Sequence, residues 1–108
     1  MADALRPEFR QAFLDELLLV ETYLGRRDGR RGRAFTRAVF DFAYEVVGTL
    51  PNGFPGYQHP SLPGVALRRA VFRGEYALLY QVTDEAVSFV YFYHTRRDIS
   101  QQDILPTA

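Results

Sequence analysis

The residues of this chain best suited to chemistry lie in its last third. Arg68 and Arg69 are adjacent near the start of an apolar stretch, and His94, Arg96 and Arg97 lie at its end. Arginine makes forked contacts with phosphate or carboxylate groups. Histidine is the side chain whose ordinary pKa suits proton transfer near neutral pH. These residue types predict contact with an anionic group, and two adjacent arginines on a strand must face opposite sides.

The apolar stretch that separates these basic residues is predicted to be a three-stranded antiparallel meander. Runs rich in β-branched and aromatic residues at 65–73, 76–83 and 86–94 are typical of strands. They are separated by short turn sequences at 74–75 and 84–85. Turns of two residues favour tight hairpins. The basic residues therefore lie at strand ends that a single sheet would position.

Two-residue turns fix a register, in which Arg73 pairs with Tyr76, Arg68 with Gln81, and Tyr76 with Tyr93. Alternation then assigns residues to two faces. The core face, expected beneath the helices, carries Val65, Leu67, Val71, Leu78, Tyr80, Val82, Val87, Phe89 and Tyr91. The opposite face carries Arg68, Ala70, Phe72, Ala77, Leu79, Gln81, Ser88, Val90, Phe92 and His94, and Arg96 if the strand persists. An exposed apolar patch of this kind commonly marks a partner site.

Two amphipathic helices are predicted before the strands. Apolar residues recur at helical spacing over 7–24 and 35–50, with Pro7 suited to the first turn. The link 26–33 holds five arginines and is interpreted as a solvated loop at the tip of a helix hairpin, with a phosphate or partner contact as the alternative. We therefore expect an α+β fold, an antiparallel helix hairpin packed on a three- to four-stranded antiparallel sheet.

Composition limits the class of protein. The 108 residues suit a single domain spanning 1–108, and 13 arginines balance 13 acids, so no global field steers the chain toward nucleic acid. Without cysteine, and with only two histidines, no disulfide, metal site or cofactor is expected. His59 lies in the Pro/Gly-rich segment 51–64 and is expected to be exposed. No signal peptide or membrane-spanning run is present, which predicts a cytoplasmic protein.

The whole arrangement resembles the RelE/ParE toxins of bacterial toxin–antitoxin pairs. The resemblance covers about the last third of the chain well, and it rests on Leu67-Arg68-Arg69, Tyr76, Tyr80 and His94-Thr95-Arg96-Arg97-Asp98. It implies a type II toxin with a cognate antitoxin, whose disordered segment folds across the toxin and masks its working surface. The family usually begins with an additional edge strand. Only six residues precede Pro7 here, so that strand is expected to be vestigial or missing and the edge open to a partner.

One activity within the family is messenger RNA cleavage in the ribosomal A site. Carried onto this chain, the resemblance to RelE-type members implies Arg68, His94 and Arg96 as the catalytic set, and by alternation these three share a face. RelE has an arginine directly after the tyrosine that matches Tyr76, and this chain has Ala77. The loss of that cation would remove charge stabilisation worth several kcal/mol of barrier. The tail after the last strand also lacks the tyrosine that RelE uses.

The other activity is inhibition of DNA gyrase by ParE-type members, which are not nucleases. The motif residues fit this version better, so the resemblance favours a ParE-like toxin. A third alternative is a binding module with the same fold and no toxicity. We expect the target or antitoxin to be contacted by Arg69, Phe72, Arg73, Phe92, Tyr93 and Arg97.

Overall fold

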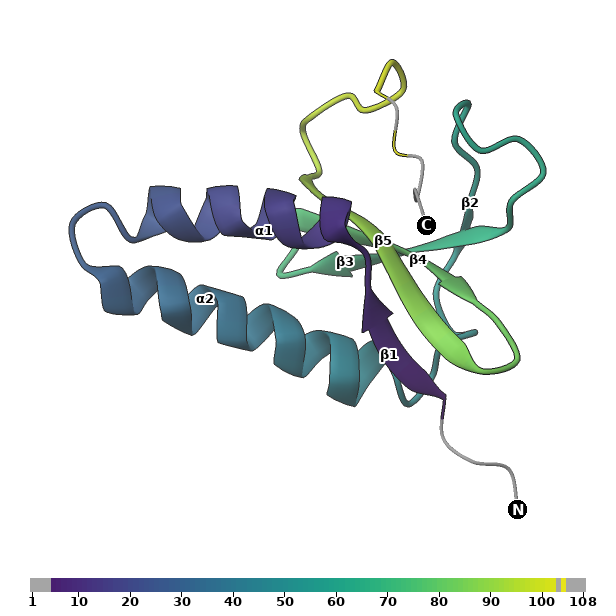
Figure 1. Ribbon diagram of the computed structural model, residues 1–108, viewed down its shortest axis with the longest axis horizontal. Coiled ribbons are helices and arrows are strands. Elements are labelled where there is room, and N and C mark those ends of the chain that lie inside the picture. The colour runs from purple at the N-terminus through teal and green to yellow at the C-terminus, as the bar shows by residue number, and fades with distance from the viewer. Residues whose placement is uncertain (1–4, 103, 105–108) are drawn as a thin grey trace.

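The computed structural model describes residues 5–102 and 104, and its fold is α+β (Figure 1). Two helices form a hairpin against one side of a five-stranded mixed sheet with the strand order β1-β5-β4-β3-β2. The elements in chain order are β1 (Arg6–Phe9), α1 (Gln11–Leu24), α2 (Gly29–Asp41), the π-helix η1 (Phe42–Val47), β2 (Gly56–Tyr57), β3 (Leu67–Phe72), β4 (Tyr76–Val82) and β5 (Ala86–His94). The α+β class and the helix hairpin are confirmed, whereas the sheet has more strands than expected and is mixed rather than antiparallel.

The additional strand β1 corrects two predictions. Pro7 lies in this strand and does not begin a helix. The strand can accommodate proline because it lies at the edge of the sheet, where a residue without an amide hydrogen is tolerated. The strand pairs in parallel with β5, from Arg6 beside Ala86 to Phe9 beside Phe89, so the edge expected to be open is covered. Phe9 stacks on Phe89 with ring centroids 5.0 Å apart. Phe9 is partly buried against the core, and its ring contacts help to hold this short strand in place.

The second helix of the hairpin begins earlier in the chain than predicted. Helix α1 ends at Gly25 as expected, but α2 starts at Gly29, inside the arginine-rich link. The Asp28 carboxylate caps α2 by accepting a hydrogen bond from the Arg30 amide at 3.0 Å. The helices approach closely at Gly32, where a methyl group would overlap the Glu21 carbonyl oxygen. The arginine-rich tip is therefore held by a cap and a tight helix crossing.

The turn between β3 and β4 differs from the predicted one. The chain reverses at Arg73 and Gly74, whose φ angles are 54° and 71°, and Phe72 then pairs with Tyr76. This one-residue shift turns β3 over relative to β4. Ala70 and Phe72 consequently face the helices, whereas Leu67 and Val71 lie on the opposite face. The predicted pairs of Arg73 with Tyr76 and Arg68 with Gln81 are wrong.

A β-bulge in β5 produces the second reversal. The turn at 84–85 has two residues as predicted, and Tyr80 pairs with Phe89, but Leu79 pairs with Tyr91. Val90 is the additional residue, so the side chains beyond it exchange faces. Phe92 therefore lies in the core beneath the helices, and Tyr91 does not. Tyr76 pairs with His94, one residue beyond the predicted partner.

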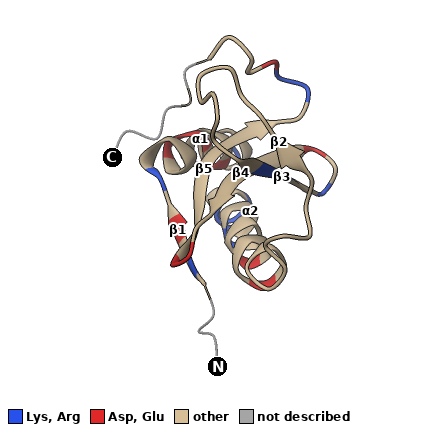
Figure 2. Cartoon of the chain, turned by 90° about the vertical axis from the view of Figure 1, so that its right-hand side faces the viewer, with Lys and Arg blue, Asp and Glu red and all other residues tan. Residues whose placement is uncertain are grey.

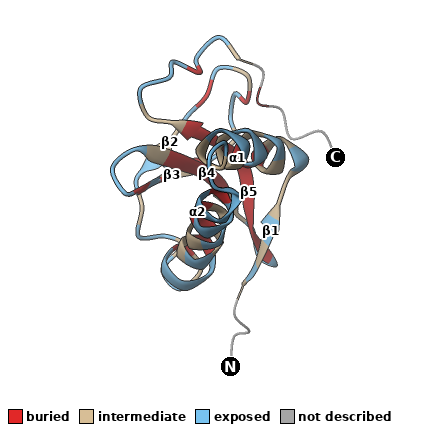
Figure 3. Ribbon diagram, turned by 90° about the vertical axis from the view of Figure 1, so that its left-hand side faces the viewer, coloured by how far each residue is buried: buried red, intermediate tan, exposed pale blue. Residues whose placement is uncertain are grey.

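Each face of the sheet carries a buried apolar cluster. The helix side holds one buried cluster, made of Phe13, Leu17, Phe35, Val39, Ala43, Val47, Ala70, Phe72, Leu78, Tyr80, Val87, Phe89 and Phe92. The other face holds Leu62, Leu67, Ala77, Leu79, Val90, Tyr91, Tyr93, Ile99 and Ile104. The chain's own loop before β3 and its C-terminal segment thus pack on part of the face expected to be open (Figure 1). Figure 3 shows the buried strands β3 and β5 behind the two helices. No helix of the described residues combines the length and apolar character that crossing a membrane requires.

Candidate functional site

The structure separates Arg68 from His94 and Arg96. Arg68 pairs with Tyr80 and His94 pairs with Tyr76, so their partners are four positions apart on β4, or about 13 Å along the strand. The Arg68 guanidinium donates to the carbonyl oxygen of Phe54 at 2.6 Å. It also donates to the Asn52 carbonyl oxygen at 3.3 Å. Arg68 therefore secures the loop before β2, at the other end of the strands from the histidine.

His94 is engaged locally at the end of β5. Its Nδ1 atom accepts a hydrogen bond from the Arg96 amide at 3.1 Å. Its ring meets the Tyr76 ring edge-on, with centroids 5.2 Å apart. The Arg96 side chain itself is exposed. The arrangement holds the imidazole in place, but it brings no arginine of β3 toward it.

Arg97 joins three elements. Its guanidinium donates to the Glu16 carboxylate of α1 at 2.8 Å and to the Gln102 side chain at 2.7 Å. A longer contact of 3.3 Å reaches the Tyr91 hydroxyl. The hydrogen bond to Glu16 raises the pKa of Arg97 above its ordinary value. Arg97 thus fixes the C-terminal segment to α1 and β5, and this contact crosses 81 residues of sequence.

A groove of about 540 Å³ lies beside β3, on the face away from the helices. Its polar centre is Arg69, whose Nε atom donates to the Tyr93 hydroxyl at 2.8 Å. Burial, with a smaller effect of Tyr93, raises the pKa of Tyr57, which keeps that phenol protonated. Within the described residues neither salt bridge involves Arg69. The groove is lined by Phe54, Pro55, Gly56, Tyr57, Arg69, Val71 and Tyr93.

The groove runs along an edge of β3 that β2 does not cover. β2 pairs only with Leu67 and Arg68, and the Arg69 amide donates to the Pro55 carbonyl oxygen at 3.0 Å. Alternate residues direct their backbone groups to the same side of a strand. The amide and carbonyl of Val71 therefore point past the end of β2, and the Val71 side chain is 39% exposed. A groove with a half-buried cation and an open strand edge can hold an extended acidic peptide.

The remaining predicted contact residues lie in different surroundings. Phe72 and Phe92 are buried in the core, so their expected place on an exposed face is wrong. Arg73 lies at the β3–β4 turn, with its guanidinium 4.8 Å from the centre of the Phe72 ring. Three groupings of the six predicted residues are brought together. Arg69 contacts Tyr93, and Arg73 lies against Phe72. Phe92, Tyr93 and Arg97 line one pocket of about 300 Å³, together with His94. Sequence patterns did not reveal Tyr57, because β2 lies in a segment that was expected to be a loop.

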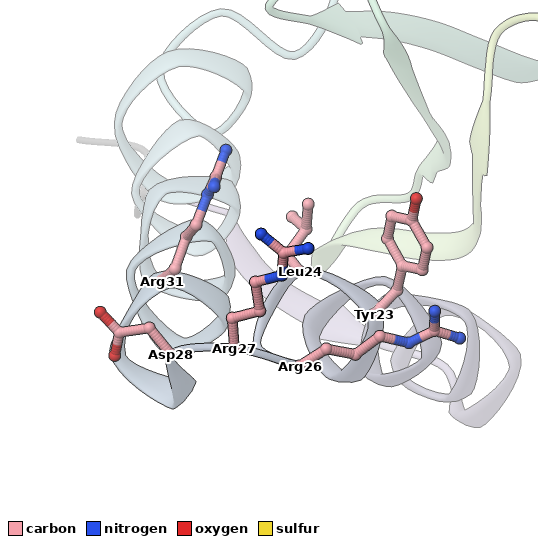
Figure 4. Close-up of a pocket in the computed structure, with 6 residues that line it drawn as sticks. All are labelled: Tyr23, Leu24, Arg26, Arg27, Asp28 and Arg31. Carbon is pink, nitrogen blue, oxygen red and sulfur yellow. The ribbon is translucent and has the colours of Figure 1, made fainter.

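A second concave region lies at the tip of the helix hairpin. Figure 4 shows Arg27, Arg31 and Tyr23 pointing to the same side of the tip, whereas Asp28 points away. The pocket between them has a volume of about 450 Å³. The Arg26 guanidinium lies 4.9 Å from the centre of the Tyr23 ring. The link expected to be a solvated loop therefore forms a basic concavity with an aromatic wall.

The next pocket extends this basic region toward the β3–β4 turn. It has a volume of about 350 Å³ and shares Leu24 and Arg31 with the first pocket. Arg73, Glu75 and Tyr76 lie on its other side. Arg31 consequently contributes to both pockets. Across residues 5–102 and 104, no group of three or more His, Asp or Glu side chains could hold a metal ion.

No family model matches the sequence, and no curated protein matches it.

Proposed function

We propose that this chain is the toxin of a type II toxin–antitoxin pair with a RelE/ParE-like fold. It acts in the ParE manner, by inhibiting DNA gyrase, and a cognate antitoxin neutralises it. The helix hairpin, the meander β3–β5 and the short strand β1 beside β5 agree with the layout that the sequence resemblance implies. The strand β1 also supplies the edge element that the sequence alone had not indicated.

The separation of Arg68 from His94 is the observation that favours gyrase inhibition over RNA cleavage. Cleavage of RNA requires a proton acceptor and a cation around one phosphate. Here the backbone positions of Arg68 and His94 are about 13 Å apart along the strands. The Arg68 guanidinium is bound to carbonyl oxygens of the loop before β2. Ala77, which stands where RelE has an arginine, is fully buried. These observations favour a toxin that binds its target over the alternative of a ribosome-dependent messenger RNA endonuclease.

The groove beside β3 is the surface that we assign to the antitoxin. An extended segment pairs with the open backbone groups of Val71 and adds a strand to the sheet. An acidic side chain of that segment binds Arg69, whose Nε atom donates to the Tyr93 hydroxyl. This placement replaces the exposed apolar patch at the middle of the face expected to be open, because the chain's own Leu62, Ile99 and Ile104 pack in one cluster with Leu79 and Val90 of that face.

Induction of the chain alone in a bacterial host tests the function. Growth arrest with DNA-break signalling and intact messages is the expected result. Purified protein should also inhibit DNA supercoiling by gyrase, and His94→Gln should inhibit equally well. Arrest with cleaved messages, lost in His94→Gln, would establish the endonuclease instead. Normal growth would leave a non-toxic binding module.

The antitoxin site is tested on Arg69 with Arg6 as the matched control. Both side chains carry one positive charge, but Arg6 lies in the edge strand β1, away from the groove. We expect Arg69→Gln to weaken capture of the co-expressed antitoxin by about tenfold or more, since an unpaired acidic group would be buried against it. Arg6→Gln should leave capture unchanged. Equal capture by both variants would contradict this placement.

A further inference from the structure

We infer that the tip of the helix hairpin is a second binding surface, which holds the phosphate backbone of a single-stranded nucleic acid. This surface comprises Tyr23, Arg26, Arg27, Arg30, Arg31 and Arg33. We name it the hairpin-tip surface. It is separate from the groove beside β3 and does not depend on the toxin assignment.

Charge is segregated along the molecule although the net charge is zero. Residues 23–37 contain six arginines and one acid, Asp28. That acid serves as the cap of α2 and forms an exposed ion pair with Arg30 at 3.3 Å. Acidic side chains such as Asp41 and Glu45 lie near the other end of the second helix (Figure 2). The hairpin-tip surface is therefore locally positive, and clustered arginine is the electrostatic footprint of a nucleic-acid site.

The arginines occupy positions where their positive charges are unfavourable as long as no anion is bound. Arg30 and Arg31 lie in the first turn of α2, and Arg33 follows immediately, while no acid lies in that turn. The N-terminal end of a helix carries a partial positive charge, so cations there are unfavourable. Bound phosphates would offset both this effect and the mutual repulsion of the arginines. An anion is thus the ligand that the free surface lacks.

The shape indicates a ligand with several anionic groups in series. The two pockets share Leu24 and Arg31, so the concave surface continues from Arg27 to Arg73, where Glu75 is the one acid that lines it besides Asp28. A single carboxylate or phosphate would meet only part of this surface. A nucleic-acid strand presents one phosphate per nucleotide, and basic grooves follow such a backbone.

An aromatic side chain stands beside the arginines. Tyr23 is 63% exposed, and the Arg26 guanidinium lies against its ring. Exposed aromatic rings stack on the bases of single strands, and arginine adds to that stacking. A duplex would keep its bases away from the ring. This side chain favours a single strand, and it favours nucleic acid over an acidic peptide, which has no bases to stack.

The test is fluorescence anisotropy of labelled oligouridylate and oligodeoxythymidylate of equal length, titrated with purified full-length chain at several salt concentrations. Three variants are compared with the unaltered protein: Arg31→Glu, the matched charge reversal Arg6→Glu, and Tyr23→Ala. Arg31 lines both pockets, whereas Arg6 lies in β1. Thermal melting is measured in parallel. Arg31→Glu should melt at or above the temperature of the unaltered protein, because an acid suits that helix end.

We expect the unaltered chain to bind with an affinity that falls as salt rises, with a logarithmic slope of about −2 for roughly three phosphates. Arg31→Glu should weaken binding by about tenfold or more and reduce the slope by about one. Tyr23→Ala should weaken binding without changing the slope. Arg6→Glu should bind like the unaltered chain. Stronger binding of oligouridylate identifies RNA as the ligand. Equal binding of the two oligonucleotides indicates that the protein recognises the phosphate backbone.

Two results would overturn the inference. One is equal binding by Arg31→Glu and Arg6→Glu in folded protein. The other is tighter binding of a labelled poly-glutamate peptide than of either oligonucleotide, with the same dependence on Arg31, which would assign the surface to an acidic protein. Both experiments use purified protein and no growth assay. A failure here therefore leaves the toxin proposal intact, and a failure of the toxin proposal leaves this one intact.

Discussion

The Nε2–H group of His59 donates a hydrogen bond of 2.6 Å to the carbonyl oxygen of Ile99, 40 residues further along the chain. The other ring nitrogen accepts from the Ser61 amide at 3.1 Å, so both sides of the imidazole have partners. The side chain is only 2% exposed. The expectation of an exposed loop histidine is therefore wrong, and His59 connects the loop before β3 to the C-terminal segment.

His59→Ala should lower the free energy of unfolding by about 2–3 kcal/mol, because it leaves the Ile99 carbonyl oxygen unsatisfied and opens a cavity. Urea unfolding at neutral pH measures the change. The control is His94→Ala, which removes a half-buried imidazole whose hydrogen-bond partner is the amide of Arg96. It should cost less than about 1 kcal/mol. Equal losses in the two variants would contradict the connecting role of His59.

The helix crossing at Gly32 gives a second prediction. Gly32→Ala should destabilise the fold by about 1–3 kcal/mol, since its methyl group would overlap the backbone of α1 at Glu21. Gly29→Ala in the same helix is the control. Its methyl group meets only the flexible end of the Arg33 side chain. That variant should be neutral or slightly stabilising, because alanine favours helix more than glycine does. Thermal melting of both variants shows whether the close approach of the helices causes the loss of stability in Gly32→Ala.

The turn between β3 and β4 predicts opposite effects at neighbouring residues. Both Arg73 and Gly74 have positive φ angles, which asparagine and glycine adopt far more readily than arginine. Arg73→Asn should therefore raise the free energy of unfolding by about 0.5–1 kcal/mol. Gly74→Ala should lower it by about 1 kcal/mol. Destabilisation by Arg73→Asn would show that the contact of Arg73 with the Phe72 ring outweighs the backbone strain.

This turn also shows why the faces of the sheet could not all be predicted from sequence. The three long strands and the 84–85 turn were predictable from β-branched and aromatic runs. Arg73-Gly74 is not one of the pairs that indicate a tight turn with two positive φ angles. The bulge at Val90 left no signal either, because apolar residues surround it on both sides. Each feature reverses which side chains of its strand face the helices. Phe72 and Phe92 therefore lie in the core and not on the exposed face where they were expected.

The candidate sites were predictable to different degrees. The arginine-rich link is visible in the sequence, but its interpretation as a loop concealed that α2 begins within it and that Arg31 lines two pockets. The groove beside β3 depends on β2, a strand of two residues in a segment rich in proline and glycine. Such a strand forms through tertiary contacts rather than through local preference. Arg69 could be selected as a candidate, whereas its neighbours Tyr57 and Tyr93 required the fold.

The last prediction concerns alkaline pH. Tyr80 is fully buried, and its hydroxyl donates to the Pro51 carbonyl oxygen at 2.6 Å. Burial raises the pKa of Tyr80 from 10.0 to about 12. The folded state therefore holds this proton at pH values where the unfolded chain has lost it. The contribution of this protonated hydroxyl to the free energy of unfolding is fully present below pH 10, and it is lost as the pH rises from 10 to about 12.

The loss attributable to this one group is about 2–3 kcal/mol at most, and urea unfolding at a series of pH values measures it. Tyr80→Phe is the matched variant. At neutral pH it should cost about 1 kcal/mol, because the Pro51 carbonyl oxygen loses its donor. Above pH 10 its stability should fall less steeply than that of the unaltered chain. The part of the decline that comes from Tyr57, Tyr76 and Tyr91, whose pKa values burial also raises, should remain in both proteins. Identical declines in the two proteins would exclude Tyr80 as the group that limits alkaline stability.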